Sequence, residues 1–123
     1  NYSTPDKTTI RDFIHVVDLA QAHLCALQKI QIPLAEYQTN SNNNNFKVYN
    51  IGTGKGYSVK QLVDSFTQVN QVKLHFKYVQ EREGDIPEVF CDASKAQKEL
   101  GWTAHKTIDD ICRDAYNFAK KKY

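Results

Sequence analysis

The stretch FKVYNIGTGKGYSVKQLVDSF, residues 46–66, predicts a strand, a tight turn and a helix in direct succession. Residues 46–51 are rich in aromatic and β-branched side chains, which is typical of a strand. Ser58 then begins a helix as its N-cap, and Gln61, three residues on, completes a capping box. A strand followed at once by a helix favours an α/β fold. The helix has an apolar stripe of Val59, Leu62, Val63, Phe66 and Val69.

Three glycines form the turn between this strand and this helix, which is where a phosphate-binding loop would lie. Gly52, Gly54 and Gly56 are spaced as G-x-G-x-G. A dinucleotide fingerprint is spaced as G-x-G-x-x-G and a P-loop as G-x-x-x-x-G-K-S/T. We therefore interpret the turn as structural, since glycines also permit a tight reversal of the chain.

The residues before this unit predict a loop, an extended stretch and a helix. Residues 1–17 end in an apolar, β-branched run, and Asp18 is the expected N-cap of the helix that follows. Pro33 closes that helix region. Residues 35–45 are polar and rich in asparagine, and we interpret them as a low-complexity surface loop.

The residues after the unit predict two short strands and two more helices. Residues 73–79 alternate apolar and polar side chains, as a half-buried strand does, and residues 88–91 form a second short strand. Asp92 caps a small helix that Gly101 ends, and Thr107 caps the last helix. The expected stripe of that last helix is Ile108, Ile111, Cys112, Ala115, Phe118 and Ala119. We therefore expect a small α/β lobe, α+β-like, with short strands and about four helices.

Length and composition limit the classes of protein that remain. The chain has 123 residues, enough for one small domain with its own core. Hydrophobic residues make up 41%, and the formal net charge is +2. That charge is too small to indicate nucleic acid or an anionic membrane as a partner. No apolar run approaches the length of a membrane span.

The chain contains no methionine, and we expect it to be a fragment of a longer protein. Its three cysteines, Cys25, Cys91 and Cys112, are odd in number and show no C-x-x-C spacing. Neither a disulfide framework nor a zinc site is therefore predicted, and free thiols in a reducing compartment are expected.

Candidate binding residues come from two segments. In the loop Arg82-Glu83-Gly84-Asp85, the Arg could bind a phosphate and the Asp could accept from two adjacent hydroxyls, although a plain charged turn explains the loop equally well. Arg11 precedes the extended stretch and could bind a phosphate or could lie on the surface. His15 could be a general base, but a structural histidine is the preferred interpretation.

Six short motifs occur in a fixed order along the chain. They are TPD (4–6), RDFIHVVDLA (11–20), YNIGTG (49–54), REGDIP (82–87), DASKA (92–96) and ELGW (99–102). In order and spacing these motifs resemble the C-terminal lobe of UDP-glucose 4-epimerases, within the extended short-chain dehydrogenase/reductase superfamily. The resemblance covers residues 1–123 apart from the asparagine-rich loop, and it implies the C-terminal substrate-binding domain without the Rossmann domain.

The resemblance implies a role for four residues of this chain. Arg11 and Arg82 would bind the UDP pyrophosphate, and Asp85 would accept hydrogen bonds from the uridine ribose. Val89 would line the hexose pocket, where a bulky residue narrows the site and a smaller one admits N-acetylated sugars. We therefore expect the intact enzyme to accept UDP-N-acetylhexosamines as well, unless Val89 is merely a different packing choice.

The resemblance also implies NAD as cofactor, UDP-glucose and UDP-galactose as substrates, and a homodimeric parent enzyme in the cytoplasm. NAD would be bound by the missing N-terminal Rossmann domain, because this chain has neither G-x-G-x-x-G nor G-x-x-G-x-x-G. No catalytic residue is assigned here, and Tyr116 with Lys120 is treated as a chance Y-x-x-x-K match. We expect the isolated chain to be inactive. Two alternatives remain: another nucleotide-sugar enzyme of the superfamily, such as a decarboxylase or dehydratase, and a non-catalytic UDP-sugar-binding module.

Overall fold

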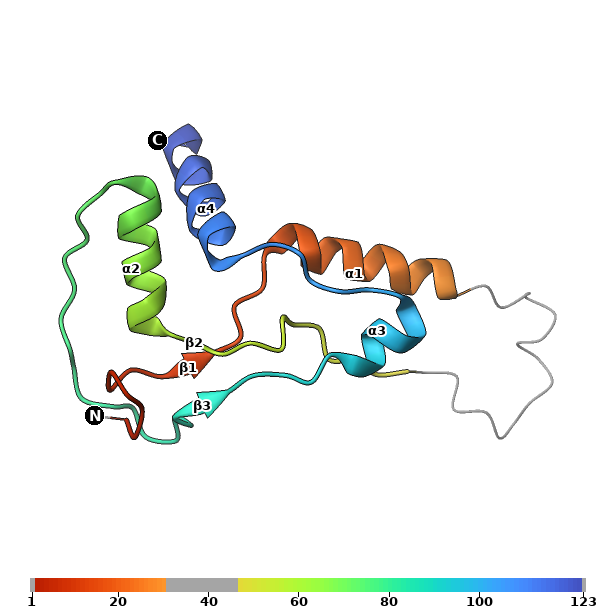
Figure 1. Ribbon diagram of the computed structural model, residues 1–123, viewed down its shortest axis with the longest axis horizontal. Helices are drawn as coiled ribbons and strands as arrows, with labels where there is room; N and C mark the ends of the chain where they lie inside the picture. Colours follow the sequence, from red (N-terminus) through yellow and green to blue (C-terminus); the bar gives the residue numbers. More distant parts are fainter. Residues whose placement is uncertain (1, 31–46, 123) are drawn as a thin grey trace.

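The computed structural model describes residues 2–30 and 47–122. Within them it has four helices and a three-stranded sheet, as expected for a small α/β lobe (Figure 1). The elements are β1 (Ile10–Arg11), α1 (Val16–Lys29), β2 (Tyr57–Ser58), α2 (Val59–Asn70), β3 (Glu88–Val89), α3 (Ser94–Leu100) and α4 (Ile108–Lys122). The strand order is β2-β1-β3, with β1 antiparallel to β2 and parallel to β3. The expectations for Pro33, residues 35–45 and Phe46 lie outside the described residues.

The helix expected after the glycine turn is confirmed. Ser58 is the N-cap of α2, its hydroxyl accepts from the amide of Gln61, and the Gln61 side chain accepts from the amide of Ser58. The helix packs against α4, where Phe66 meets Tyr116 edge to face with ring centroids 5.7 Å apart. Cys112 of α4 is 1% exposed in the same interface. The capping box thus fixes where α2 begins, and the apolar contacts with α4 hold it in place.

The main core lies between α1 and α3. Its buried members are Ala22, Ala96, Leu100 and Trp102. Small side chains on both helices let the two backbones approach, and the Trp102 ring fills the remaining space. The indole nitrogen of Trp102 donates to the carbonyl oxygen of Asp18 at 3.0 Å, so this buried polar group is satisfied.

The sequence predicted Asp18 as the N-cap of α1, and this prediction is wrong. The helix begins at Val16, and His15 is the cap: its Nδ1 accepts from the amide of Val17 at 3.0 Å. Asp18 is buried instead, and its carboxylate accepts from the amides of His105 and Lys106 at 3.0 and 2.8 Å. A carboxylate near the start of a helix can accept hydrogen bonds either from the first amides of that helix or from a distant loop. Here the carboxylate of Asp18 binds the amides of the distant loop.

Two expected strands are absent from the sheet. Residues 47–51 and 73–79 lie outside any strand of the described part of the chain. Residues 73–80 are exposed, including Phe76 at 53% and Tyr78 at 59%. Figure 1 shows this segment running alone from the end of α2 back towards β3. An alternating sequence forms a strand only where a partner supplies the ladder, and the described residues supply none here.

The last third of the chain agrees with expectation in part. Gly101 ends α3 with φ +68°, and the Thr107 hydroxyl accepts from the amide of Asp110 at 3.2 Å, ahead of α4. Asp92 is not the N-cap of α3, because Ala93 holds that position; Asp92 accepts from the amide of Ser94 at 2.9 Å. The second short strand is β3, two residues rather than four. The apolar stripe of α4 is not fully buried, since Phe118 is 69% exposed.

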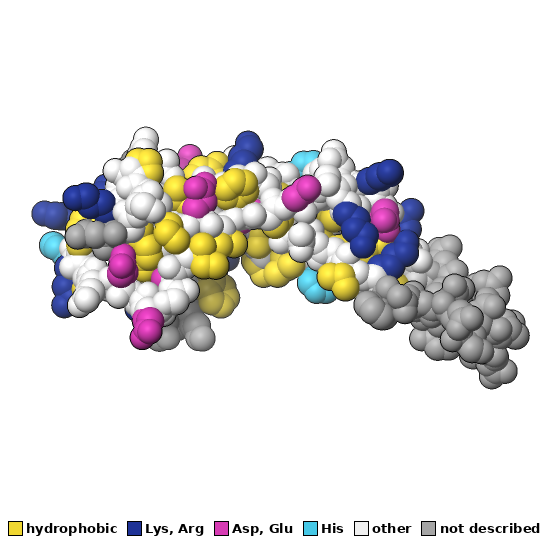
Figure 2. Space-filling model, turned by 90° about the horizontal axis from the view of Figure 1, so that it is seen from below, with side chains coloured by type: hydrophobic (Ala, Val, Ile, Leu, Met, Phe, Trp, Pro, Cys, Tyr) yellow, Lys and Arg dark blue, Asp and Glu magenta, His cyan; other side chains and the backbone are white. Residues whose placement is uncertain are grey.

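Apolar side chains also reach the surface on α1, on the side opposite its buried residues. The exposed members are Val16, Val17, Leu19, Leu24 and Leu27, and Ile30 follows them at the helix end. Figure 2, seen from below Figure 1 and so from the side away from α1, shows that hydrophobic side chains reach the surface on that side of the molecule as well. An exposed apolar patch favours association, either with further protein or with other copies. None of the helices in the described ranges is both long and apolar enough to cross a membrane.

Candidate nucleotide-binding site

The loop of residues 82–85 is a tight turn fixed against the sheet. The amide of Asp85 donates to the carbonyl oxygen of Arg82 at 3.2 Å, and Gly84 has φ +83°, a conformation that favours glycine. Immediately after the turn, the carbonyl oxygen of Pro87 accepts from the amide of Ile10 at 2.8 Å. The loop is therefore attached to β1, the strand that carries Arg11.

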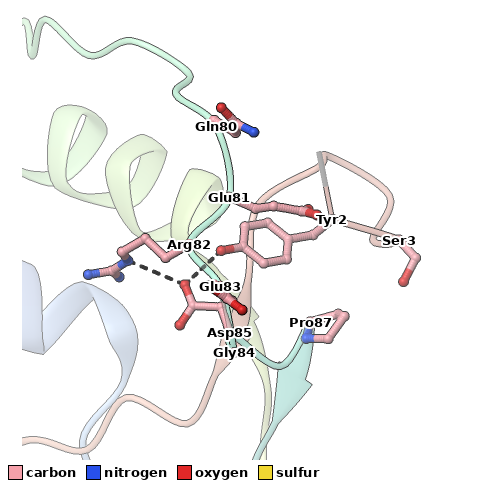
Figure 3. Close-up of a pocket in the computed structure, with 9 residues that line it drawn as sticks. All are labelled: Tyr2, Ser3, Gln80, Glu81, Arg82, Glu83, Gly84, Asp85 and Pro87. Carbon is pink, nitrogen blue, oxygen red and sulfur yellow. Dashed lines mark hydrogen bonds and ion pairs between the residues drawn. The ribbon is translucent and has the colours of Figure 1, made fainter.

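Asp85 is the centre of the charged cluster in this loop. Its Oδ2 accepts from the Tyr2 hydroxyl at 2.7 Å and lies 3.4 Å from Nε of Arg82 (Figure 3). The Tyr2 hydrogen bond lowers the pKa of Asp85, partial desolvation opposes it, and the charges of Arg82 and Arg11 lower the pKa further. The same hydrogen bond raises the pKa of Tyr2. Asp85 is thus held as a carboxylate with an acceptor to offer.

Arg11 and Val89 lie beside this cluster on neighbouring strands. They are register partners in the parallel pairing of β1 with β3. Nη1 of Arg11 donates to the carbonyl oxygen of Ile10 at 2.8 Å, with a longer contact of 3.5 Å to that of Pro87. The side chain of Val89 is 46% exposed. The fold therefore brings the four sequence-predicted residues into one region, with Arg82 and Asp85 in direct contact.

An open hollow of about 510 Å³ adjoins the loop. It is lined by Tyr2, Ser3, Gln80, Glu81, Arg82, Glu83, Gly84, Asp85 and Pro87. The side chain of Arg82 is 87% exposed and that of Asp85 26%. An exposed guanidinium can turn towards a ligand, whereas the half-buried carboxylate is fixed, so the two can hold different parts of one molecule.

The glycine turn is occupied by a carboxylate from its own chain. Oδ1 of Asp12 accepts from the amide and hydroxyl of Thr53 at 2.9 and 2.6 Å, and Oδ2 accepts from the amide of Gly54 at 3.0 Å. A Cβ on Gly52 would lie 2.6 Å from Oδ2 of Asp12 and 2.5 Å from Sγ of Cys91. The amides that a phosphate would need are engaged, which agrees with the structural interpretation of the turn.

His15 is a structural residue here. Its side chain is buried, at 4% exposed. Nδ1 accepts a hydrogen bond from the amide of Val17, so the proton of the ring is on Nε2. Nε2 donates to Oδ2 of Asp114 at 3.1 Å. The ring therefore links the start of α1 to α4. Tyr116 and Lys120 both lie on α4. Nζ of Lys120 is 5.1 Å from the centroid of the Tyr116 ring, and the same ring packs against Phe66, so both residues make packing contacts there.

Tyr2 is the member of the site that the sequence did not reveal. It binds a residue 83 positions later, so no local spacing connects the two.

Comparison with known proteins identifies the family of this chain. Residues 2–115 match a family model described as GDP-mannose 4,6 dehydratase. A UDP-glucose 4-epimerase of Dictyostelium discoideum is 43% identical over 118 residues, which cover 96% of this chain and 32% of the relative. This chain thus spans about a third of the length of the curated relatives it matches.

Solved structures give the same result. The UDP-glucose 4-epimerase of Bifidobacterium longum, in complex with NAD+ and UDP, superposes with a TM-score of 0.83 at 39% identity, over 98% of this chain and 32% of that one. The UDP-Glc/GlcNAc 4-epimerase of Campylobacter jejuni gives a TM-score of 0.73 at 34% identity, over 98% and 33%. The match lies in the C-terminal part of the epimerase structures. The chain belongs to the GDP-mannose 4,6 dehydratase family, and the relatives that it resembles over almost its whole length include UDP-glucose 4-epimerases.

Proposed function

We propose that this chain is the UDP-binding part of an NAD-dependent UDP-glucose 4-epimerase that interconverts UDP-glucose and UDP-galactose. The observation that carries the proposal is the surroundings of Asp85, whose pKa is lowered by the charges of both Arg82 and Arg11. Asp85 and Arg82 line an open hollow, and Arg11 lies outside that lining, on the adjacent strand β1. Curated epimerases that are about 40% identical support the same assignment, as does a separate epimerase structure, 39% identical and in complex with NAD+ and UDP.

In this proposal Arg82, Arg11 and Asp85 bind different parts of the nucleotide. Arg82 is exposed enough to turn towards a pyrophosphate, and Arg11 reaches the same region from β1. Guanidinium groups bind phosphate oxygens through paired N–H donors. Asp85 has an acceptor oxygen to offer to ribose hydroxyls, and it must face the ribose because its charge would repel the phosphates.

NAD supplies the hydride transfer in such a reaction. The residues of this chain do not fit a dinucleotide site, since the chain has no glycine fingerprint and Asp12 occupies the amides of its glycine turn. We assign NAD, and the acid–base groups, to the part of the enzyme outside these 123 residues. The isolated chain is then inactive, and the parent enzyme is proposed to be a cytoplasmic homodimer.

We also propose that the parent enzyme accepts UDP-N-acetylhexosamines. Val89 has a small side chain that is 46% exposed, and it is the register partner of Arg11 in the parallel pairing of β3 with β1. A small residue beside the phosphate-binding arginine leaves room for a bulkier sugar. The resemblance to a UDP-Glc/GlcNAc 4-epimerase supports this wider specificity.

A titration of the 123-residue chain with uridine, UMP and UDP tests the binding role. Two arginines that clamp a pyrophosphate predict that affinity rises at each added phosphate and weakens with salt. Chemical-shift changes in ¹⁵N NMR spectra should fall on Arg11 and residues 82–85. Equal affinity for the three compounds, or changes elsewhere, would count against the proposal.

A further inference from the structure

The hydroxyl of Tyr2 makes a hydrogen bond to the charged centre of the site. Its hydroxyl donates to Oδ2 of Asp85 at 2.7 Å, and its ring lines the hollow. Figure 3 shows the ring lying beside the loop with its oxygen directed at the carboxylate. The bond connects the first residues of the chain to a loop 83 positions away.

Arg82 approaches the same oxygen through Nε alone, so the N–H donors of its two Nη atoms remain for a phosphate. Its Nε lies 3.4 Å from Oδ2, while its side chain is 87% exposed. If the guanidinium turns away to an anionic ligand, Asp85 still keeps the hydrogen bond from Tyr2. Within residues 2–30 and 47–122, the contacts from Tyr2 and Arg82 both fall on Oδ2, which leaves Oδ1 to accept from a ligand.

We propose that Tyr2 is a positioning residue for nucleotide recognition: it fixes the carboxylate of Asp85 through Oδ2 and leaves Oδ1 to accept hydrogen bonds from the ribose hydroxyls. The inference rests on the proposed UDP-binding function and adds a residue to it. Tyr2 acts through Asp85 and does not itself touch the nucleotide. Its effect must therefore depend on the ribose hydroxyls and be independent of the phosphates.

The test uses UDP and 2′,3′-dideoxy-UDP as probes, with the unmodified chain and three variants. Tyr2→Phe removes the hydroxyl and keeps the ring, and Asp85→Asn removes the charge of the acceptor. Tyr78→Phe is the matched control, since that ring packs edge to face on Phe76 and is 59% exposed. Affinities are measured by NMR titration, and Trp102 fluorescence checks that each variant is folded.

Tyr2→Phe is expected to weaken UDP binding about three- to ten-fold, the size of one ordinary hydrogen bond, because Tyr2 acts on the nucleotide only through Asp85. It should leave dideoxy-UDP binding unchanged, and Tyr78→Phe should change neither. The pKa of Asp85 in Tyr2→Phe should rise towards its ordinary value of 3.8.

Equal losses for the two nucleotides, or no loss for either, would overturn the role of Tyr2. If Asp85→Asn selectively weakens UDP while Tyr2→Phe does not, the inference fails and the proposed function stands. If the unmodified chain binds UDP and dideoxy-UDP equally, Asp85 does not read the ribose, and Tyr2 loses its role. If the unmodified chain binds neither nucleotide, the proposed function fails and the inference falls with it.

Discussion

The carboxylate of Asp12 binds Thr53 twice, through its amide at 2.9 Å and its hydroxyl at 2.6 Å, across 41 positions of sequence. It also accepts from the amides of Gly54 and Cys91 at 3.0 and 3.4 Å. Burial raises the pKa of Asp12, but the hydrogen bonds from Thr53, Gly54 and Cys91 outweigh it, and the pKa lies below its ordinary value of 3.8. One ionised side chain thus joins the end of β1, the glycine turn and the residues after β3.

Asp12→Asn should lower the free energy of unfolding by about 1 kcal/mol at neutral pH, because an amide nitrogen cannot accept these hydrogen bonds. The folded-state pKa is depressed, so the stabilisation is complete above the ordinary pKa of 3.8 and is lost as the pH falls through the folded value. Urea unfolding followed by Trp102 fluorescence should show the difference between the two proteins shrinking below about pH 4. A difference that stays constant down to about pH 2 would contradict this role.

Asp18→Ala should destabilise the chain by about 1–3 kcal/mol, because the amides of His105 and Lys106 lose their acceptor. Asp64→Ala is the matched control, since Asp64 is an exposed helix carboxylate paired only with Lys60 at i,i+4 in the described contacts. Such a pair contributes a few tenths of a kcal/mol, about 0.5 at most. Urea midpoints that move equally in the two variants would show that Asp18 does not anchor the loop.

Thr107→Ala should shorten α4 at its first turn and lower stability by about 1 kcal/mol, as the loss of an N-cap does. The amide and hydroxyl of Thr107 hold the pKa of Asp110 at about 2. NMR titration should find that pKa rising towards 3.8 in the variant. Because the pKa is depressed, stability from Asp110 is present above 3.8 and is lost as the pH falls towards about 2. An unchanged Asp110 pKa would refute the cap.

The features that the sequence predicted correctly are governed by neighbours within a few residues. The capping box of Ser58 with Gln61, the cap at Thr107 and the αL glycine at Gly101 each need only adjacent backbone groups. The expected fold class, four helices with short strands in the described ranges, follows from that local chemistry.

The misjudged features depend on distant partners. Residues 73–79 alternate like a strand, but pairing requires a neighbour that the described residues do not provide. Asp18 was taken as a cap because nothing local indicates the loop at residues 105–106 that uses it. The candidate site depends on distant partners too: the roles of Arg11, Arg82 and Asp85 are implied by the family resemblance and stay a prediction, and the Tyr2 contact exists only after folding.

Val89→Tyr in the full-length enzyme tests the sugar preference. A bulky ring at this position should reduce kcat/KM for UDP-N-acetylglucosamine at least about ten-fold while UDP-glucose turnover changes little, because only the larger sugar needs the space. Steady-state assays with both substrates measure the ratio. No turnover of UDP-N-acetylglucosamine by the unmodified enzyme would rule out the wider specificity.

The account depends most directly on UDP affinity measured by NMR titration for the unmodified chain, an Arg82→Ala, Asp85→Ala double variant and Lys55→Ala. Lys55 is an exposed cation of the glycine turn, so it controls for general charge. We predict that the double variant binds UDP at least about ten-fold more weakly than the unmodified chain, and that Lys55→Ala binds it equally well. Equal UDP affinity in the double variant and the unmodified chain, or no UDP binding by the latter, would contradict the assignment of this loop.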